Sequence, residues 1–174
     1  IYGTLVSNMA SDLHHLFPIT EEVNNNKRSK PYADLVKQGL SPDTYWYNNT
    51  AYTIEPSAEI VLLSSKRTTQ LWEPRDVVKG NVARAVAYFY TMYELDPKVG
   101  GSLVWEILEV ATMRLWNRQD GVDEEELARN ERVFAFQQNY NPFVLHPELV
   151  DVVFEEQGLS GGQACLPLGE GCKE

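Results

Sequence analysis

Apolar residues recur at helical spacing through the second half of the chain. The clearest run extends from Asn81 to Tyr93, and three more follow it before residue 157. Each run places apolar positions three or four residues apart, which aligns them on one face of a helix. Residues suited to begin or end these helices are Asn81, Asp96-Pro97, Ser102, Asp123 and His146-Pro147. The pattern predicts a body of about four helices over residues 81–157.

Shorter and less regular patterns occupy the first 80 residues. Alternation over Met9–Phe17 predicts a short strand, and Thr20 followed by two glutamates is typical of a helix start. Prolines and polar runs in residues 31–80 predict long loops, with short strands near 44–54 and 59–63. The aromatic trio Tyr45-Trp46-Tyr47 is interpreted as a buried strand, with interface anchors as the alternative. Together these elements predict an α+β fold that is predominantly α-helical.

Composition and charge narrow the class of protein. The chain has 174 residues, of which 43% are hydrophobic, as in one folded domain, and no stretch approaches the roughly 20 apolar residues of a membrane span. The net charge of −10 argues at first against nucleic-acid binding, because such proteins neutralise phosphates with clustered Lys and Arg. Residues 1–100, however, contain 11 acidic and 10 basic side chains, whereas residues 101–174 contain 14 acidic and 5 basic ones. Most of the negative charge therefore lies in residues 101–174, and residues 1–100 are nearly neutral.

Local basic groups occur within that nearly neutral part. They are Lys27/Arg28/Lys30, Lys66/Arg67 and Arg75/Lys79/Arg84. Groups of this kind are most often solvated surface, but they also allow a phosphate-binding face.

Residues 12–29 hold the densest group of chemically capable side chains. The motif Asp-Leu-His-His-Leu-Phe-Pro contains Asp12, His14 and His15, and Val-Asn-Asn-Asn-Lys-Arg-Ser follows it. Carboxylate, imidazole and amide groups suit a hard metal ion, and Arg28 can hold a phosphate through two N–H groups. The structural alternative is that Asp12 and His14 only hydrogen-bond to order a turn.

Five stretches of sequence stand out together. They are Asp-Leu-His-His-Leu-Phe-Pro; Val-Asn-x-x-x-Arg-Ser; Lys79-Gly80-Asn81-Val82-Ala83-Arg84-Ala85 with Tyr88-Phe89-Tyr90-Thr91-Met92-Tyr93; Glu126-x-x-Arg129-Asn130; and Gln137-x-Asn139-x-Asn141-Pro142-Phe143. In this order, between about residues 9 and 157, they resemble the bacterial endonuclease I family. Those proteins are secreted or periplasmic non-specific nucleases with a ββα-metal, or His-Me, finger. The resemblance implies one domain over residues 1–157, in which a partial finger at 1–30 packs on the helical body.

The resemblance also implies particular site residues. In that family a strand carries a Glu-His pair, in which the His activates water and the Glu helps to hold Mg²⁺, and an Asn on the finger's helix is a further metal ligand. That Asn is Asn24 when counted from the motif before it, or Asn25 when counted back from Arg28. Arg28 and Arg84 become candidates for phosphate contact, and Arg84 alternatively for tying the finger to the helical half. The implied cofactor is Mg²⁺ or another divalent cation.

No Glu-His pair occurs in the 174 residues. His14 and His15 follow the position of the missing pair and are expected near the site, whereas His146 is interpreted as a helix cap or a surface residue. Two hypotheses remain open. In the first, an upstream strand supplies the general base, and the complete protein cleaves DNA or RNA. In the second, the chain has lost that strand and serves as an inactive structural or partner-binding subunit, whose partner is a protein.

Residues 158–174 form a Gly-rich tail that contains Cys165 and Cys172. A disulfide between them is the plain interpretation, and two free thiols are the alternative. Together with the family resemblance, the cysteines predict a secreted or periplasmic location.

Overall fold

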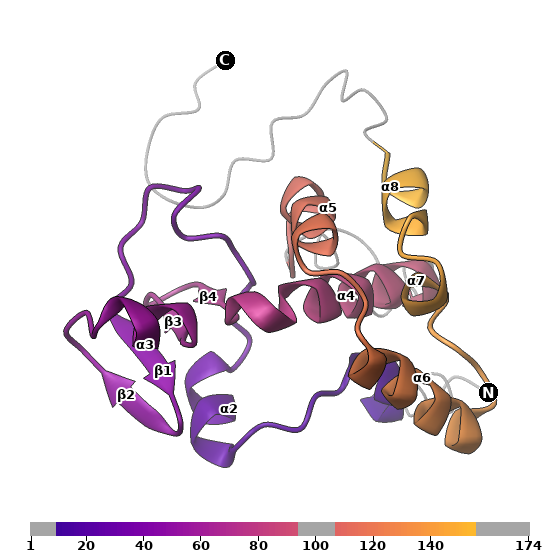
Figure 1. Cartoon of the computed structure of the whole chain (residues 1–174), viewed down its shortest axis with the longest axis horizontal. Coiled ribbons are helices and arrows are strands. Elements are labelled where there is room, and N and C mark those ends of the chain that lie inside the picture. The colour runs from indigo at the N-terminus through magenta and orange to yellow at the C-terminus, as the bar shows by residue number, and fades with distance from the viewer. Residues whose placement is uncertain (1–9, 94–106, 156–174) are drawn as a thin grey trace.

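The computed structural model describes residues 10–93 and 107–155, and all structural statements below concern these residues. Helix α4 (Lys79–Tyr93) runs through the middle of the molecule. A small sheet lies towards one end of this helix, and a group of further helices lies towards the other, as Figure 1 shows. Helix α4 therefore links the sheet at one end of the fold to the helices at the other.

The elements before α4 are mostly short. They are η1 (Leu13–His15), α2 (Glu21–Lys27), β1 (Thr44–Tyr47), β2 (Thr50–Tyr52), α3 (Ala58–Leu62), β3 (Ser65–Arg67), β4 (Trp72–Glu73) and η2 (Asp76–Val78). Four helices follow α4 in the described residues. They are α5 (Val110–Gln119), α6 (Glu124–Gln137), α7 (Pro142–Leu145) and α8 (Leu149–Val153). This content confirms an α+β fold in which helix predominates.

The four strands form an antiparallel sheet in the order β2-β1-β3-β4. In the central strand β1, Trp46 stands opposite Ala51 on one side and Ser65 on the other. Tyr45 and Trp46 are buried, as the sequence predicts, whereas Tyr47 is partly exposed. Buried aromatic side chains of this size supply much of the apolar area that stabilises a small sheet.

Helix α4 packs against α5 and forms the centre of the hydrophobic core. Ala83 and Ala87 are fully buried on α4, and their small side chains allow close approach of neighbouring elements. The larger core side chains are Tyr88, Tyr90, Leu108, Met113, Trp116, Phe143, Val150 and Phe154. Burial of a side chain of this kind contributes roughly 1.5–3 kcal/mol relative to exposure. Most residues of α4 are buried, as expected of a helix at the centre of the core.

Local signals predict several helix boundaries correctly. Thr20 caps α2, and the Asp123 side chain accepts a hydrogen bond from the N–H of Glu126 at 2.8 Å at the start of α6. Helix α8 follows His146-Pro147 as expected. The short helix α7 was not predicted, although Asn141 caps it and Pro142 occupies its first position.

The expected second helix begins later than its apolar stripe indicates. Helix α5 starts at Val110, while Leu108 forms a β-bridge with Tyr32 instead. The proposed cap Ser102 lies outside the described residues, as do Asp96-Pro97, Cys165 and Cys172. The bridge to Tyr32 shows that a tertiary partner takes Leu108 out of helical geometry.

Two predicted strands are wrong. Residues 58–62 form the helix α3, because a short apolar run does not distinguish the two periods and Ser57 provides a helix start. Residues 13–15 form a 3-10 turn, because the Asp12 carboxylate accepts a hydrogen bond from the N–H of His14 at 2.9 Å. A side chain that bonds two residues ahead offers the backbone a turn in place of an extended strand.

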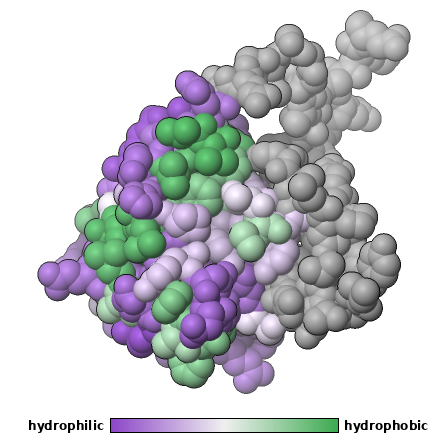
Figure 2. All heavy atoms as spheres, turned by 90° about the vertical axis from the view of Figure 1, so that its right-hand side faces the viewer, coloured by the Kyte–Doolittle hydropathy of each residue, from purple (hydrophilic) through white to green (hydrophobic). Residues whose placement is uncertain are grey.

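The surface is mainly hydrophilic, with separate apolar patches on the side of the later helices (Figure 2). Exposed apolar side chains on α6, α7 and α8 include Phe136, Leu145, Val152 and Val153. Within residues 10–93 and 107–155, no helix has the length and hydropathy needed to cross a bilayer.

Candidate functional site

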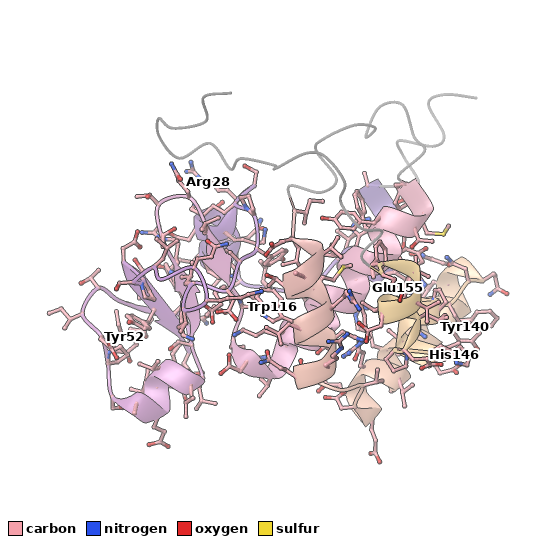
Figure 3. All side chains as sticks on the ribbon, turned by 90° about the horizontal axis from the view of Figure 1, so that it is seen from above. Arg28, Tyr52, Trp116, Tyr140, His146 and Glu155 are labelled. Atoms are coloured by element: carbon pink, nitrogen blue, oxygen red, sulfur yellow. The ribbon has the colours of Figure 1, made fainter. Side chains whose placement is uncertain are left out.

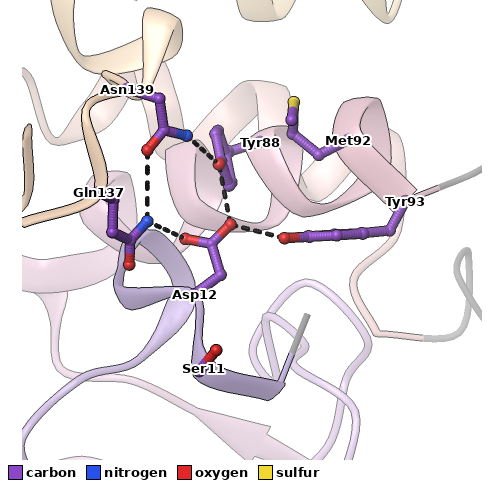
Figure 4. A pocket seen from close by; sticks show the side chains of 7 residues that line it. All are labelled: Ser11, Asp12, Tyr88, Met92, Tyr93, Gln137 and Asn139. Carbon is purple, nitrogen blue, oxygen red and sulfur yellow. Dashed lines mark hydrogen bonds between the residues drawn. The ribbon is translucent and has the colours of Figure 1, made fainter. Parts of the chain in front are cut away.

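Asp12 lies at the centre of a polar network between η1, α4 and the end of α6 (Figure 4). Its carboxylate accepts hydrogen bonds from the Tyr88 hydroxyl at 2.8 Å, the Tyr93 hydroxyl at 2.7 Å and the Gln137 amide at 3.0 Å. The Asn139 amide donates in turn to the Tyr88 hydroxyl at 2.8 Å. These residues line a cavity of about 370 Å³. The network holds the first described turn of the chain against two helices.

The network also sets the protonation of its members. Burial raises the pKa of Asp12, but hydrogen bonds from Gln137, Tyr93, the His14 N–H and Tyr88 outweigh it, so the net shift is downward. Burial and the nearby Asp12 carboxylate raise the pKa of both Tyr88 and Tyr93. Asp12 is thus a carboxylate and the two tyrosines are neutral donors at neutral pH. A carboxylate with this many donors is suited to hold structure in place.

The two histidines of the motif pack on α4. His14 is 1% exposed, and its Nε2 lies 3.0 Å from the carbonyl oxygen of Asn139, which can only accept a hydrogen bond. Burial lowers the pKa of His14, although Asn139 and Asp12 oppose this effect. His15 lies edge-on to the ring of Phe89 at 5.1 Å. His14 is therefore a neutral donor within the fold.

Helix α2 carries the three consecutive asparagines. Asn24 and Asn25 are exposed, and their side chains make no hydrogen bond to any other described residue. Asn26 is different, because its amide donates to the Glu22 carbonyl oxygen at 2.8 Å and its Oδ1 accepts from Arg67 at 3.0 Å. Asn26 is thus structural, whereas the amide oxygens of Asn24 and Asn25 are available to a ligand.

Arg28 terminates α2 with an unusual backbone. Its φ is 49° and its ψ is −137°, a region that favours glycine, while its N–H still donates to the Asn24 carbonyl oxygen at 2.8 Å. The Nε of Arg28 donates to the Asn25 carbonyl oxygen at 3.0 Å. Figure 3 shows the Arg28 side chain at the edge of the molecule. Within the described part of the chain, its two terminal nitrogens have no hydrogen-bond partner, so they can meet an anion.

Arg84 occupies a different environment. It is fully buried, and its Nε donates to Glu126 at 2.9 Å. One terminal nitrogen donates to the Asn117 side chain at 3.1 Å and to the Asp120 carbonyl oxygen at 2.9 Å. A guanidinium enclosed in this way is not presented to a phosphate at the surface. Arg84 ties α4 to α5 and α6, rather than the residues of the expected finger to the helical half.

The motif residues of α6 and the following loop hold η1 in place. Arg129 donates to the carbonyl oxygens of Leu13 and Leu16 and lies over the ring of Phe17 at 5.1 Å. Asn130 and Asn141 hydrogen-bond to each other through backbone and side-chain groups. The sequence marks these residues by family resemblance alone, because nothing in their local spacing indicates their partners.

The predicted site residues fall into two groups. His14 and His15 contact α4, whereas Asn24, Asn25 and Arg28 belong to α2, which is linked to β3 through Asn26. His146 is exposed, lies 3.3 Å from Glu148 and stands at the far end of the molecule from Arg28 (Figure 3). Across residues 10–93 and 107–155, no three His, Cys, Asp or Glu side chains come together as a metal centre would require.

The amino-acid sequence can be compared with those of known proteins. Residues 1–148 match the family model described as Endonuclease I. The chain belongs to the endonuclease I family.

Several known nucleases are similar in sequence to this endonuclease I chain. An extracellular ribonuclease of Bacillus amyloliquefaciens is 28% identical over 163 residues, covering 88% of this chain and 49% of the relative. An extracellular deoxyribonuclease and a periplasmic deoxyribonuclease of Aeromonas hydrophila are 27% and 26% identical, each covering 78% of this chain and 49% and 48% of the relative. The chain thus spans about half the length of the curated relatives that it matches.

Proposed function

We propose that this endonuclease I chain contributes to a metal-dependent nuclease that hydrolyses phosphodiester bonds in DNA or RNA. The match of residues 1–148 to the family carries the proposal. The names of the relatives, which include both ribonucleases and deoxyribonucleases, support a broad nucleic-acid substrate. Contacts to the phosphate backbone, which is common to both nucleic acids, would account for such breadth.

Asn24 is the proposed metal ligand, with Asn25 as the alternative. Exposure of both side chains and the structural commitment of Asn26 support this choice. Mg²⁺ prefers oxygen ligands and usually keeps several waters, so one amide oxygen on α2 fits part of its shell. Where bound, the cation would neutralise the charge that develops on the phosphate during hydrolysis. Its other protein ligands are not assigned to this chain.

Arg28 is the proposed phosphate contact. Its backbone follows Asn24 by one helical turn, and the Nε bond to Asn25 directs the side chain along the end of α2. A guanidinium offers two N–H groups to a phosphate in one plane, which orients the phosphate as well as attracting it.

The histidines of η1 are assigned a positioning role. His14 is committed to Asn139, and its lowered pKa keeps it neutral. The family resemblance assigns the general base to a strand before the Asp-Leu-His-His motif, which leaves this pair a positioning role. Asp12 and Arg129 would fix the path of the chain between that strand and α2.

A secreted or periplasmic location is also proposed. Relatives described as extracellular and periplasmic support it. Nucleic acid is the proposed partner, and its contact with this chain would be through the backbone and hence sensitive to salt.

A nicking assay tests the function. The full-length protein is incubated with supercoiled plasmid and with structured RNA, in Mg²⁺ and in EDTA. The double variant Asn24→Ala/Asn25→Ala is expected to lose about a hundredfold or more in rate if an amide of α2 holds the cation. Gln38→Ala, which removes an exposed amide in the connection between α2 and β1, is the matched control. Full activity of the double variant would refute the metal site, and absence of cleavage with every divalent cation would favour the inactive, partner-binding alternative.

A further inference from the structure

Cationic side chains gather where the end of α2 meets the sheet. Lys30, four residues after Asn26, and Arg67 on β3 both donate hydrogen bonds to Asn26. The Lys30 Nζ donates to the Asn26 carbonyl oxygen at 2.6 Å, and Arg67 donates to its Oδ1 at 3.0 Å. Lys27 and Arg28 complete the group from the last turn of α2 and its cap. Local sequence could not reveal this meeting, because 41 residues separate Asn26 from Arg67.

These cations have few counter-charges. Arg67 pairs with Asp43, its Nε lying 3.2 Å from the carboxylate, and also donates to the Thr44 hydroxyl at 3.1 Å. Among the described residues, Asp43 is the one carboxylate in ion-pair contact with the group. Four cations thus face a single anion, in a protein whose net charge is −10.

Helix capping accounts for part of the arrangement. Arg28 and Lys30 donate to carbonyl oxygens of the last turn of α2, where the helix dipole favours positive charge, and Lys27 donates to the Lys30 carbonyl oxygen just beyond it. That end of a helix, however, is equivalent to only about half an elementary charge. Capping therefore leaves most of the positive charge of the group without a partner.

The crowding of like charges is visible at Lys30. Burial lowers its pKa, and the positive charges of Arg67 and Arg28 lower it further, while Asp43 opposes them. Like charges held this close repel each other unless an anion joins them.

Free donors are available to such an anion. Arg67 uses three of the five N–H groups of a guanidinium, and Lys30 uses one of its three. Charge and free donors of this kind match a phosphate.

We propose that Lys30 and Arg67 bind a phosphate of the nucleic-acid backbone that flanks the one assigned above to Arg28. The bound nucleic-acid strand would then run from α2 across the contact between α2 and β3. This assignment of the anion to nucleic acid rests on the proposed function. Binding would be independent of base sequence, because every contact is to the backbone.

Equilibrium binding tests the proposal without any cleavage. Fluorescence anisotropy of a labelled DNA duplex is measured in EDTA over a range of salt concentrations. Each phosphate contact contributes about 0.9 to the slope of log K against log salt. Lys30→Gln is expected to reduce that slope by about 0.9 and to weaken binding several-fold at low salt, and Arg67→Gln to do at least as much. Lys30→Arg, which keeps the charge, should retain the slope of the parent protein.

The controls separate this surface from general electrostatics. Lys37→Gln removes an exposed lysine outside the group and should leave the slope unchanged. Because Arg67 also anchors α2, circular dichroism must show an intact fold, and Lys30→Gln alone remains decisive if Arg67→Gln unfolds. An unchanged slope in Lys30→Gln, or an equal loss in Lys37→Gln, would overturn the proposal.

Three further outcomes identify the ligand and show which of the two proposals has failed. Inorganic phosphate that shifts the NMR signals of Lys30 and Arg67, without any nucleic-acid binding, would overturn the assignment to a polymer. Cleavage in the nicking assay with no change of salt slope in Lys30→Gln would leave the nuclease proposal intact and refute this surface. A reduced slope without cleavage would support the surface and refute the nuclease activity.

Discussion

Arg84 on α4 and Glu126 on α6 form an ion pair enclosed by the protein, with side chains 0% and 6% exposed. The Nε of Arg84 lies 2.9 Å from Oε1 of Glu126, and further bonds reach Asn117 and Asp120. The pair joins the central helix to the helix that holds η1. Its geometry therefore affects both the core and the turn that precedes the candidate site.

Removal of Glu126 should destabilise the protein strongly. Glu126→Ala leaves the guanidinium of Arg84 buried without its carboxylate, which costs about 3–5 kcal/mol. The measurement is the free energy of unfolding in urea. Glu125→Ala removes an exposed carboxylate from the same turn of α6 and should cost less than about 1 kcal/mol. Similar losses in both variants would contradict the enclosed pair.

Gly80 should not tolerate a side chain. A Cβ at this position would overlap the Asp120 carbonyl oxygen and approach the terminal nitrogens of Arg84 to 2.9 Å. Because a backbone atom must move, we expect Gly80→Ala to lower the free energy of unfolding by about 2 kcal/mol or more. Gly121→Ala, where no atom lies within 4 Å of the added carbon, is the control and should change stability by less than about 0.5 kcal/mol. A neutral Gly80→Ala would show that α4 and the Asp120 turn are less closely packed.

The backbone conformation at Arg28 should favour glycine over alanine, the reverse of the usual order in a helix. Its φ of 49° strains any residue with a Cβ, so Arg28→Gly should be more stable than Arg28→Ala by about 1 kcal/mol. At Lys27, which is helical, the order should reverse, because glycine in a helix is less favourable than alanine by about 1 kcal/mol. Thermal unfolding of the four variants gives both differences. Alanine preferred at both positions would argue against the positive φ.

Asp12 should make stability depend on acid pH. Its pKa in the folded protein lies below the ordinary value of 3.8, despite burial, because several donors favour the carboxylate. The stabilisation is therefore present above about pH 4 and is lost as the pH falls through the lowered pKa. We expect Asp12→Asn to lower Tm at pH 7, and we expect the difference in Tm between variant and parent protein to shrink as the pH falls. A difference in Tm that is constant from pH 7 to pH 2 would contradict this role.

Long amphipathic runs predicted the helical body well. Helix α4 follows directly from apolar spacing. Helix α6 begins at the expected cap, but its apolar residues Leu127 and Phe136 are exposed. Thr20 and Asp123 act as caps through bonds to residues only three positions away. Interactions within one turn leave a local signal in the sequence, which is why these boundaries were accessible. The short run at 59–63 carried too few residues to distinguish a helix from a strand.

The site was predictable only in part. Family resemblance singled out Asn24 or Asn25 and Arg28, and the exposure of all three is compatible with ligand contact. Resemblance offered two roles for Arg84, and burial against Glu126 favours a structural one. Arg67 stood in a basic pair without distinguishing features, because its contact with Asn26 depends on how α2 meets β3.

Local sequence was enough to predict helices α4, α6 and α8, the caps Thr20 and Asp123 and the unequal distribution of charge, since each depends on neighbours within a few positions. Tertiary structure alone decided that Asp12 and His14 are buried while Leu13 is 37% exposed, the reverse of their hydropathy. Partners 76 and 125 residues away, Tyr88 and Gln137, satisfy the buried Asp12 carboxylate. A buried polar group is stable only when such distant donors are in place, and the spacing of residues along the chain does not encode where they meet.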